Sequence, residues 1–143
     1  MNEKISDRLD SGQLAALFAA SPFMSTLGLE VLKLDYEKTE LSVRMPLRAA
    51  FERRAGTQQF HGGAIASLID VTGDFAIGMM LGGGVPTINL RIDYLKPAVG
   101  AALTAVARVR RTGKTVAVVD IDVTDEKGGT VALGRGTYYP QRG

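Results

Sequence analysis

The 143-residue sequence contains no cysteine and no tryptophan, and it has a single histidine, His61. The missing cysteines exclude disulfide bonds, thiolate metal sites and a cysteine nucleophile. One histidine is too few for a multi-histidine zinc site and leaves only one base for a Ser-His-Asp triad. The sequence also has no large excess of charge of one sign, because 17 Lys and Arg against 15 Asp and Glu leave a net charge of +2. This small, scattered excess does not indicate a nucleic-acid-binding protein.

Long uninterrupted apolar runs are missing too. The longest apolar stretches carry Asp70, Asp74 or clustered glycines, so the sequence predicts no membrane-spanning segment. The N-terminal MNEKISDRLD is polar and partly acidic, without the basic and then apolar layout of a signal peptide. We therefore expect a cytoplasmic protein. A content of 45% hydrophobic and 22% charged residues is typical of a globular domain with one core.

Hydrophobic periodicity predicts two helices and six strands. Helical spacing covers 13–20, which ends at Ser21-Pro22, and 64–81, which ends at three glycines. Strands are expected within 27–45, divided by a turn at 36–38, and at 87–95, 102–111, 115–124 and 130–139. A one-residue slip in the alternation after Val31 indicates a β-bulge in the first strand.

The fold class predicted from these elements is α+β. The long helix is apolar nearly all round, as buried helices are, and the strands alternate between apolar and polar residues. This combination favours one antiparallel sheet curled around a central helix. We assign residues 1–24 to an N-terminal lead-in with the short helix, and residues 25–143 to a single domain.

Two carboxylates interrupt the long apolar helix. Asp70 and Asp74 lie four residues apart and therefore share one face. A charge buried between helix and sheet is costly unless it is paired. Either both side chains point along a solvent-facing stripe, or they line a cavity or subunit interface and do acid–base or nucleophilic work. Neighbouring carboxylates with little water nearby hold protons more tightly, which suits a general base.

His61-Gly62-Gly63 stands where this helix is expected to begin. Glycines there leave the first N–H groups open at the positive end of the helix dipole, where they can polarise a carbonyl oxygen. In the structural alternatives, the glycines serve only a sharp turn and His61 only orders the loop. The histidine before the glycines, with Asp70 two turns into the helix, favours the functional interpretation of the glycines. For His61 itself, ordering the loop by hydrogen bonds is the commoner role.

Four segments taken together resemble a known family. They are His61-Gly62-Gly63 with Asp70 nine positions after the histidine, IDYLKPA at 92–98, RRTGK at 110–114 and VALGRGT at 131–137. In this order and at these separations, the sequence resembles the hotdog-fold acyl-CoA thioesterases, and among them the phenylacetate-degradation type. The resemblance covers about residues 25–139.

The resemblance implies a long helix lying in a highly curved antiparallel sheet. It also implies a homodimer whose sheets join edge to edge, often paired into a homotetramer. The implied reaction is hydrolysis of an acyl-CoA thioester to a free acid and CoA. No metal ion or cofactor takes part, because CoA belongs to the substrate, and neither nucleic acid nor membrane is an expected partner.

The resemblance further assigns catalytic roles by position. The family's carboxylate, a general base or nucleophile, falls on Asp70, and the N–H that polarises the thioester carbonyl falls on Gly62 of the other subunit, next to His61. A hydroxyl that helps to hold the water falls near Thr87, counted back from Tyr94. The position one turn after the acid is Asp74, a carboxylate in place of a hydroxyl.

One family position departs from the pattern. Many relatives carry Asn or Gln six residues before the histidine to orient the water or the carbonyl, whereas this chain has Ala55 there. Gln58 and Gln59 stand closer to the motif and are candidate replacements. Gly63 and Tyr94 are further candidates for substrate contact.

Cationic residues are candidates for the CoA phosphates, because phosphates favour arginine forks and lysine point charges near a flexible rim. The cationic candidates are Arg53 and Arg54 before the long helix, and Arg110, Arg111 and Lys114 at the predicted hairpin, with the hydroxyl of Thr115 beside them. Lys114 and Thr115 match family positions that contact CoA. The acyl pocket is expected among Phe51, Phe60, Leu68 and Met80; the alternative for all four is a place in the core, and for Leu68 that alternative is favoured.

Two alternative functions stay open. A hotdog hydratase or dehydratase would use His61 and Asp70 on the acyl carbons, although the surrounding motif does not match that chemistry. A non-catalytic acyl-CoA-binding module would gain nothing from a carboxylate such as Asp70 beside a thioester carbonyl. Release of free CoA distinguishes hydrolysis from both alternatives.

Overall fold

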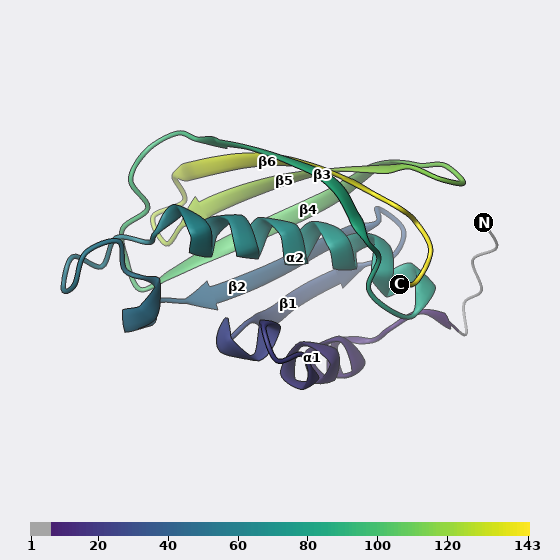
Figure 1. Ribbon diagram of the computed structural model, residues 1–143, viewed down its shortest axis with the longest axis horizontal. Helices are drawn as coiled ribbons and strands as arrows, with labels where there is room; N and C mark the ends of the chain where they lie inside the picture. Colours follow the sequence, from purple (N-terminus) through teal and green to yellow (C-terminus); the bar gives the residue numbers. More distant parts are fainter. Residues whose placement is uncertain (1–6) are drawn as a thin grey trace.

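The computed structural model describes residues 7–143, in which six antiparallel strands form one curved sheet around a long helix (Figure 1). The strands are β1 (Glu30–Asp35), β2 (Glu40–Pro46), β3 (Thr87–Tyr94), β4 (Ala102–Thr112), β5 (Ala117–Asp125) and β6 (Thr130–Tyr138). The helices are α1 (Ser11–Ala20) and α2 (Gly62–Leu81), with short 3₁₀ turns η2 (Met24–Thr26) and η3 (Ala49–Phe51). The sheet order β1-β2-β4-β5-β6-β3 places β1 and β3 at the two edges.

This arrangement confirms the predicted α+β fold. The β1–β2 pairing shifts register between Val31 and Lys33, where the sequence indicates a bulge. Antiparallel hairpins join β4 to β5 and β5 to β6, as predicted. In the second hairpin the Asp125 carboxylate accepts hydrogen bonds from the N–H groups of Lys127 and Gly129, which closes the turn.

Helix α2 begins two residues earlier than the predicted 64–81. His61 precedes the first turn, and its ring Nδ1 accepts a hydrogen bond from the Gly63 N–H. This cap lets the chain become helical at Gly62, so both glycines belong to the first turn rather than to a preceding bend. Gly82 ends the helix with a φ of 92°, the left-handed conformation that glycine adopts without strain.

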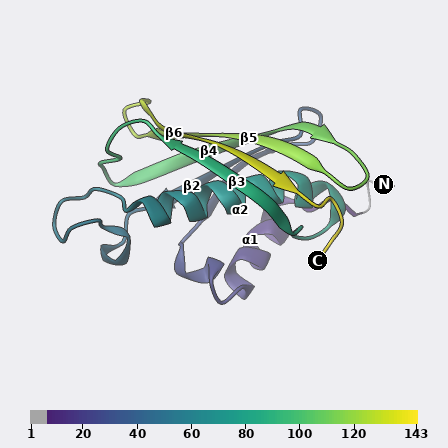
Figure 2. The same ribbon diagram turned by 45° about the horizontal axis from the view of Figure 1, so that its top comes forward.

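The apolar sequence of α2 belongs to the core. Leu68, Ile69, Ala76 and Met79 are fully buried, and Figure 2 shows the sheet on one side of α2 and α1 on the other. In the described part of the chain, α2 is long and apolar enough to span a membrane, with a mean hydropathy of 1.6. By length and composition alone, α2 therefore departs from the prediction that no segment can span a membrane, because its two aspartates and its glycines do not lower the mean hydropathy enough to exclude it. Burial explains the composition, because 78% of that stretch lies inside the fold.

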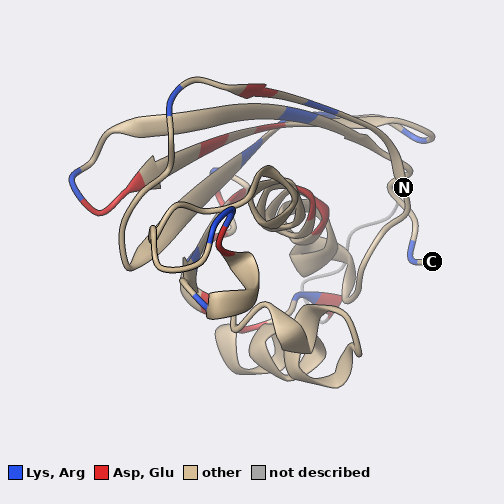
Figure 3. Cartoon of the chain, turned by 60° about the vertical axis from the view of Figure 1, so that its left-hand side comes forward, with Lys and Arg blue, Asp and Glu red and all other residues tan. Residues whose placement is uncertain are grey.

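Charged residues occupy neighbouring strands of the sheet, marked by blue and red segments in Figure 3. On β5, Asp120 and Asp122 alternate with buried residues, so their side chains lie on the outer face of the sheet, away from α2. Arg108 on β4 bridges Glu40 on β2 and Asp122 on β5 at 3.2 and 3.3 Å. Arg135 on β6 holds Asp120 on β5 through two hydrogen bonds of 2.7 and 2.9 Å. These cross-strand pairs account for the polar half of the alternation in the strand sequences.

Helix α1 joins the core through an aromatic contact. Asp10 accepts a hydrogen bond from the Gln13 N–H at 2.7 Å, and the Gln13 side chain accepts one from the Asp10 N–H at 2.9 Å. This capping box fixes the start of α1. The helix then places Phe18 edge-on against Phe75 of α2, with ring centroids 5.1 Å apart.

Replacing Phe18 by alanine should lower the free energy of unfolding by about 3–4 kcal/mol, because it removes a buried ring and leaves a cavity beside Phe75. Urea denaturation measures the loss. Phe23→Ala is the matched control: its ring is 58% exposed, so its loss should stay within about 0.5 kcal/mol. Equal losses in the two variants would contradict the place of α1 in the core.

Candidate active site

Asp70 lies half-buried in α2, where two strands reach its carboxylate. The hydroxyl of Thr87, the first residue of β3, donates to Asp70 Oδ1 at 2.8 Å. The hydroxyl of Tyr138, the last residue of β6, lies 3.2 Å from the Asp70 carbonyl oxygen and 3.4 Å from Oδ1. These contacts hold Asp70 between two strands and do not fit a solvent-facing stripe.

Two glycines make room for Tyr138. A Cβ on Gly73 of α2 or on Gly136 of β6 would collide with the Tyr138 side chain. Tyr138 is fully buried, and burial raises its pKa, with the negative charges of Asp70 and Asp74 adding to the rise. The phenol therefore keeps its proton and remains a donor to Asp70.

Asp74, one turn further along α2, contacts the segment that joins α2 to β3. Its Oδ1 accepts a hydrogen bond from the Val85 N–H at 2.7 Å. Burial raises the pKa of Asp74 to about 7; the Val85 hydrogen bond opposes this rise, and the charge of Asp70 adds to it. Near neutral pH, a large fraction of Asp74 is therefore protonated.

The first turn of α2 presents an open N–H. His61 Nδ1 accepts a hydrogen bond from the Gly63 N–H at 2.9 Å, so this N–H is not available to a ligand. Among residues 7–143 the Gly62 N–H has no acceptor, and it lies at the positive end of the helix. The Tyr94 hydroxyl donates to the Gly62 carbonyl oxygen at 2.8 Å and ties β3 to this turn.

A hollow of about 540 Å³ opens beside this turn. Its lining includes Gly62, Gly63 and three further residues that the sequence analysis names as substrate contacts: Arg53, Gln59 and Tyr94. Phe60 and Ile65 supply apolar walls, and Lys96 supplies a second cation that the sequence analysis does not name. The structure thus gathers one group of the predicted substrate contacts at the N-terminus of α2.

Other predicted contacts lie outside this hollow. Gln58 is exposed with a φ of 57°, and its N–H donates to Glu52 at 2.7 Å. Arg54 and Ala55 are exposed in the same loop. Of the two glutamines considered as replacements, Gln59 is the one beside Gly62.

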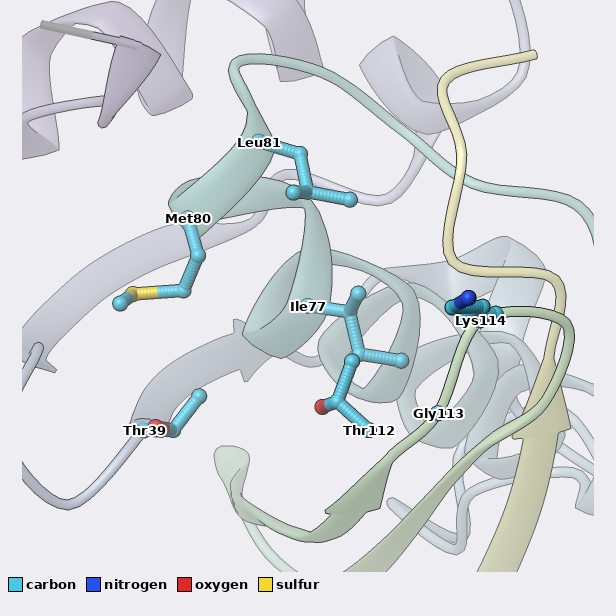
Figure 4. Close-up of a pocket in the computed structure, with 7 residues that line it drawn as sticks. All are labelled: Thr39, Ile77, Met80, Leu81, Thr112, Gly113 and Lys114. Atoms are coloured by element: carbon cyan, nitrogen blue, oxygen red, sulfur yellow. The ribbon is translucent and has the colours of Figure 1, made fainter. Parts of the chain in front are cut away.

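The predicted CoA cations of the β4–β5 hairpin separate in the structure. Lys114 borders a hollow of about 300 Å³ at the C-terminal end of α2 (Figure 4). The other residues around it are Thr39, Ile77, Met80, Leu81, Thr112 and Gly113. Arg110 instead pairs with Asp120 at 3.6 Å, among the charges of the outer face, and Arg111 and Thr115 are exposed.

The four residues predicted to form an acyl pocket do not share one cavity. Phe60 borders the hollow beside Gly62, whereas Met80 borders the hollow at the other end of α2. Leu68 is fully buried in the core. Phe51 lies in a third depression with His61. The 20 residues of α2, about 30 Å at 1.5 Å per residue, keep these positions apart.

Sequence reasoning missed Tyr138 and the Val85 N–H. A signal for Tyr138 exists, because Gly134, Gly136 and Tyr138 lie at every second position and so share one face of β6. The two glycines let the helix approach this face, and the large Tyr138 side chain that follows them reaches the helix. No signal marks Val85, because its contribution is a backbone N–H that any residue except proline carries.

The distance between the two ends of the site is set by the helix. Gly62 and Asp70 are eight residues apart, so their backbones lie about 12 Å apart along α2. A single carbonyl group cannot contact both groups of one chain.

Residues 58–132, half of the chain, match the Thioesterase superfamily, and this stretch includes Gly62, Asp70 and Thr87. The chain belongs to the thioesterase superfamily. It is 30% identical over 125 residues to the acyl-coenzyme A thioesterase PaaI of Escherichia coli, covering 87% of this chain and 86% of that protein. It is 29% identical over 133 residues to the medium/long-chain acyl-CoA thioesterase YigI of Escherichia coli, covering 82% and 84% of the two chains.

Solved structures of the thioesterase superfamily share this fold. The structure of the E. coli PaaI protein, from the phenylacetic acid degradation operon, matches with a TM-score of 0.76 and 29% identity. The match covers 90% of this chain and 94% of that one. The predicted resemblance to hotdog thioesterases of the phenylacetate-degradation type is confirmed.

The raised pKa of Asp74 predicts a pH-dependent stability. Between the ordinary value of 3.8 and about 7, the folded protein keeps a proton that the unfolded chain has lost, so stability falls as pH rises through this window. Asp74→Asn removes this fall. Measured by urea denaturation, the free energy of unfolding of the variant relative to that of the wild type should therefore rise by roughly 2–4 kcal/mol between pH 4 and pH 8. A difference that stays constant over this range would contradict the buried, proton-binding carboxyl.

Proposed function

We propose that this protein hydrolyses acyl-CoA thioesters to a free acid and CoA. The observation that carries the proposal is the Asp70 carboxylate, held on an apolar core helix by Thr87 and Tyr138. The resemblance to PaaI and YigI, both acyl-CoA thioesterases, supports the substrate class. The proposed reaction uses no metal ion or cofactor.

The proposed chemistry uses the free side of Asp70. Both hydroxyls contact Oδ1, and Oδ2 has no donor within residues 7–143. As a general base, Oδ2 takes a proton from water while the water oxygen attacks the thioester carbon. The tetrahedral intermediate then expels the CoA thiolate, which takes up a proton. As a nucleophile, Oδ2 attacks the thioester carbon and expels the CoA thiolate, which takes up a proton; water then hydrolyses the mixed anhydride to the free acid and the Asp70 carboxylate.

The Gly62 N–H of a second copy polarises the thioester carbonyl in this proposal. It is an open donor at the positive end of α2, and such a donor stabilises the negative charge that develops on the carbonyl oxygen. The separation of about 12 Å within one chain requires that Asp70 and this N–H come from different copies.

Strand β3 is the edge through which two copies would join. Among residues 7–143 it has no partner on its outer side, and Ile88 on it is 57% exposed. Pairing two copies there would bring their α2 helices alongside each other. The hollow beside Gly62 would then receive the part of the substrate that carries the thioester carbonyl. Arg53, in that hollow, and Lys114, in the hollow at the C-terminal end of α2, are candidates for contacts with the CoA phosphates.

Replacing Asp70 by asparagine should lower kcat at least about a hundredfold, because the amide keeps the shape but cannot accept the proton. The assay follows CoA release with a thiol reagent over a panel of acyl-CoAs. Thermal stability should hold or rise, because a half-buried carboxylate is lost. Asp122→Asn, a change of the same type on the outer face, is the control and should keep full turnover.

Three outcomes contradict the proposal. Near-full turnover by Asp70→Asn together with a loss in Asp74→Asn would assign the chemistry to Asp74. Turnover unaffected by either change would refute the mechanism. A wild type that consumes acyl-CoA without releasing CoA would indicate a hydratase, and one that binds without turnover would indicate a binding module.

Replacing Ile88 by glutamate should give an inactive monomer, because like charges would face each other across paired β3 edges. Sedimentation velocity measures the mass, and circular dichroism checks that the sheet persists. Leu32→Glu, at a side chain of equal type that is 52% exposed on β1, is the control and should leave assembly and activity unchanged. A wild type that is active as a stable monomer at micromolar concentration would refute the shared site.

A further inference from the structure

Helix α2 holds the segment leading into β3 through the side chain of Asp74. Its Oδ1 accepts the Val85 N–H at 2.7 Å, and Val85 is buried. Gly84 lies against the same carboxyl group, since a Cβ there would be 3.5 and 3.6 Å from the two oxygens. The carboxyl group thus restrains the chain just before β3 from the helix side, while the N–H groups of Tyr139 and Gly143 hold the carbonyl oxygens of Pro86 and Gly84 at 2.9 and 3.2 Å from the other side.

Thr87 follows Val85 by two residues, and its hydroxyl donates to Asp70 at 2.8 Å. The register of the β3–β6 pair shifts between Thr87 and Asn89, so the regular ladder starts only after Thr87. Ladder hydrogen bonds alone therefore restrain Thr87 less than they would in a regular strand. The bond between Val85 and Asp74 supplies a restraint from the helix side.

The groups around Asp74 disfavour its negative charge. Asp70 on the same helix adds a second negative charge close by, and the Tyr138 phenol on β6 keeps its proton and so brings no positive charge. Within the described residues no ion pair reaches Asp74, and Arg142 of the C-terminal segment lies against residues 82–83 instead. Burial accordingly raises the pKa of Asp74 to about 7.

We propose that Asp74 is a positioning residue: its carboxyl group holds the connection between α2 and β3 so that the Thr87 hydroxyl stays on Asp70. This role rests on the thioester hydrolysis proposed above. With Oδ1 occupied by Thr87, Asp70 presents Oδ2 to water. Asp74 acts in its uncharged form, which leaves one negative charge rather than two beside a transition state that is itself becoming negative.

Two substitutions at Asp74 separate its hydrogen bond from its charge. Asp74→Ala removes the acceptor for Val85, so kcat should fall about tenfold while KM stays within about twofold. Asp74→Asn keeps an oxygen that can accept the same N–H, so at pH 6 its kcat should stay within about twofold of the wild type. An unchanged kcat in Asp74→Ala, or an equal fall in both variants at pH 6, overturns the proposal.

The pH profile of kcat tests the uncharged form. In the wild type, kcat should fall above about pH 7 as Asp74 loses its proton, and in Asp74→Asn this fall should be absent. A fall with the same midpoint in both proteins overturns the part of the proposal that concerns the charge.

A double-mutant cycle tests whether Asp74 acts through Thr87. Thr87→Val removes the hydroxyl that contacts Asp70, and adding Asp74→Ala should then lower kcat less than twofold further, because both changes affect the same hydrogen bond. A second, independent tenfold loss would show that Asp74 acts by another route.

Hydrogen exchange tests the restraint without substrate. In Asp74→Ala, the Val85 amide should exchange at least about tenfold faster than in the wild type, and in Asp74→Asn it should stay protected. In the wild type, NMR should show the Val85 amide shift following the Asp74 carboxyl with one midpoint, a measurement that needs no variant. Separate midpoints, or unchanged exchange in Asp74→Ala, overturn the role of Asp74. A wild type that releases no CoA overturns the proposed function instead.

Discussion

The structure depends on how two carboxylates are accommodated on a helix that the sheet otherwise buries in apolar contacts. Asp70 and Asp74 lie on one face of α2, and neither is paired with a cation in the described part of the chain. Neutral donors satisfy them instead. Thr87 and Tyr138 contact Asp70, and the Val85 N–H contacts Asp74. Hydrogen bonds from neutral donors leave the carboxylates without the permanent neutralisation that a lysine or arginine would bring.

This arrangement explains features of the fold that are otherwise unrelated. Gly73 and Gly136 are needed because the Tyr138 ring must fit between helix and sheet to reach Asp70. The connection after α2 folds back so that Val85 meets Asp74, which also delivers Thr87 to Asp70 at the start of β3. The outer face of the sheet follows the opposite rule, since its carboxylates are matched to arginines across neighbouring strands. The two carboxyl groups proposed to act in catalysis thus lie on the helix at the inner face of the sheet, whereas the ion-paired carboxylates lie on its outer face.

The helix also accounts for the proposed division of the site between two copies. Its N-terminal turn offers an open N–H at Gly62, and its middle offers Asp70, but a rigid helix keeps the two apart by about 12 Å. The exposed edge of β3 carries Tyr94, which ties that strand to the Gly62 turn, and Thr87, which ties it to Asp70. A contact between copies along β3 would therefore lie next to both halves of the site.

The sequence by itself determined the fold class and marked the candidate site residues. Apolar periodicity placed the central helix and all six strands, because the pattern of burial repeats at the period of each element. Two acids on an apolar helix, and glycines at its start, marked Asp70, Asp74 and Gly62. Only the tertiary structure decided what contacts them. Tyr138 and Val85 lie outside α2 in the sequence. Their separation from Asp70 and Asp74 along the chain does not predict which strand end packs against which turn of the helix. For the same reason the predicted acyl pocket and the predicted CoA cations separated, since residues that share a chemical type occupy opposite ends of a helix about 30 Å long.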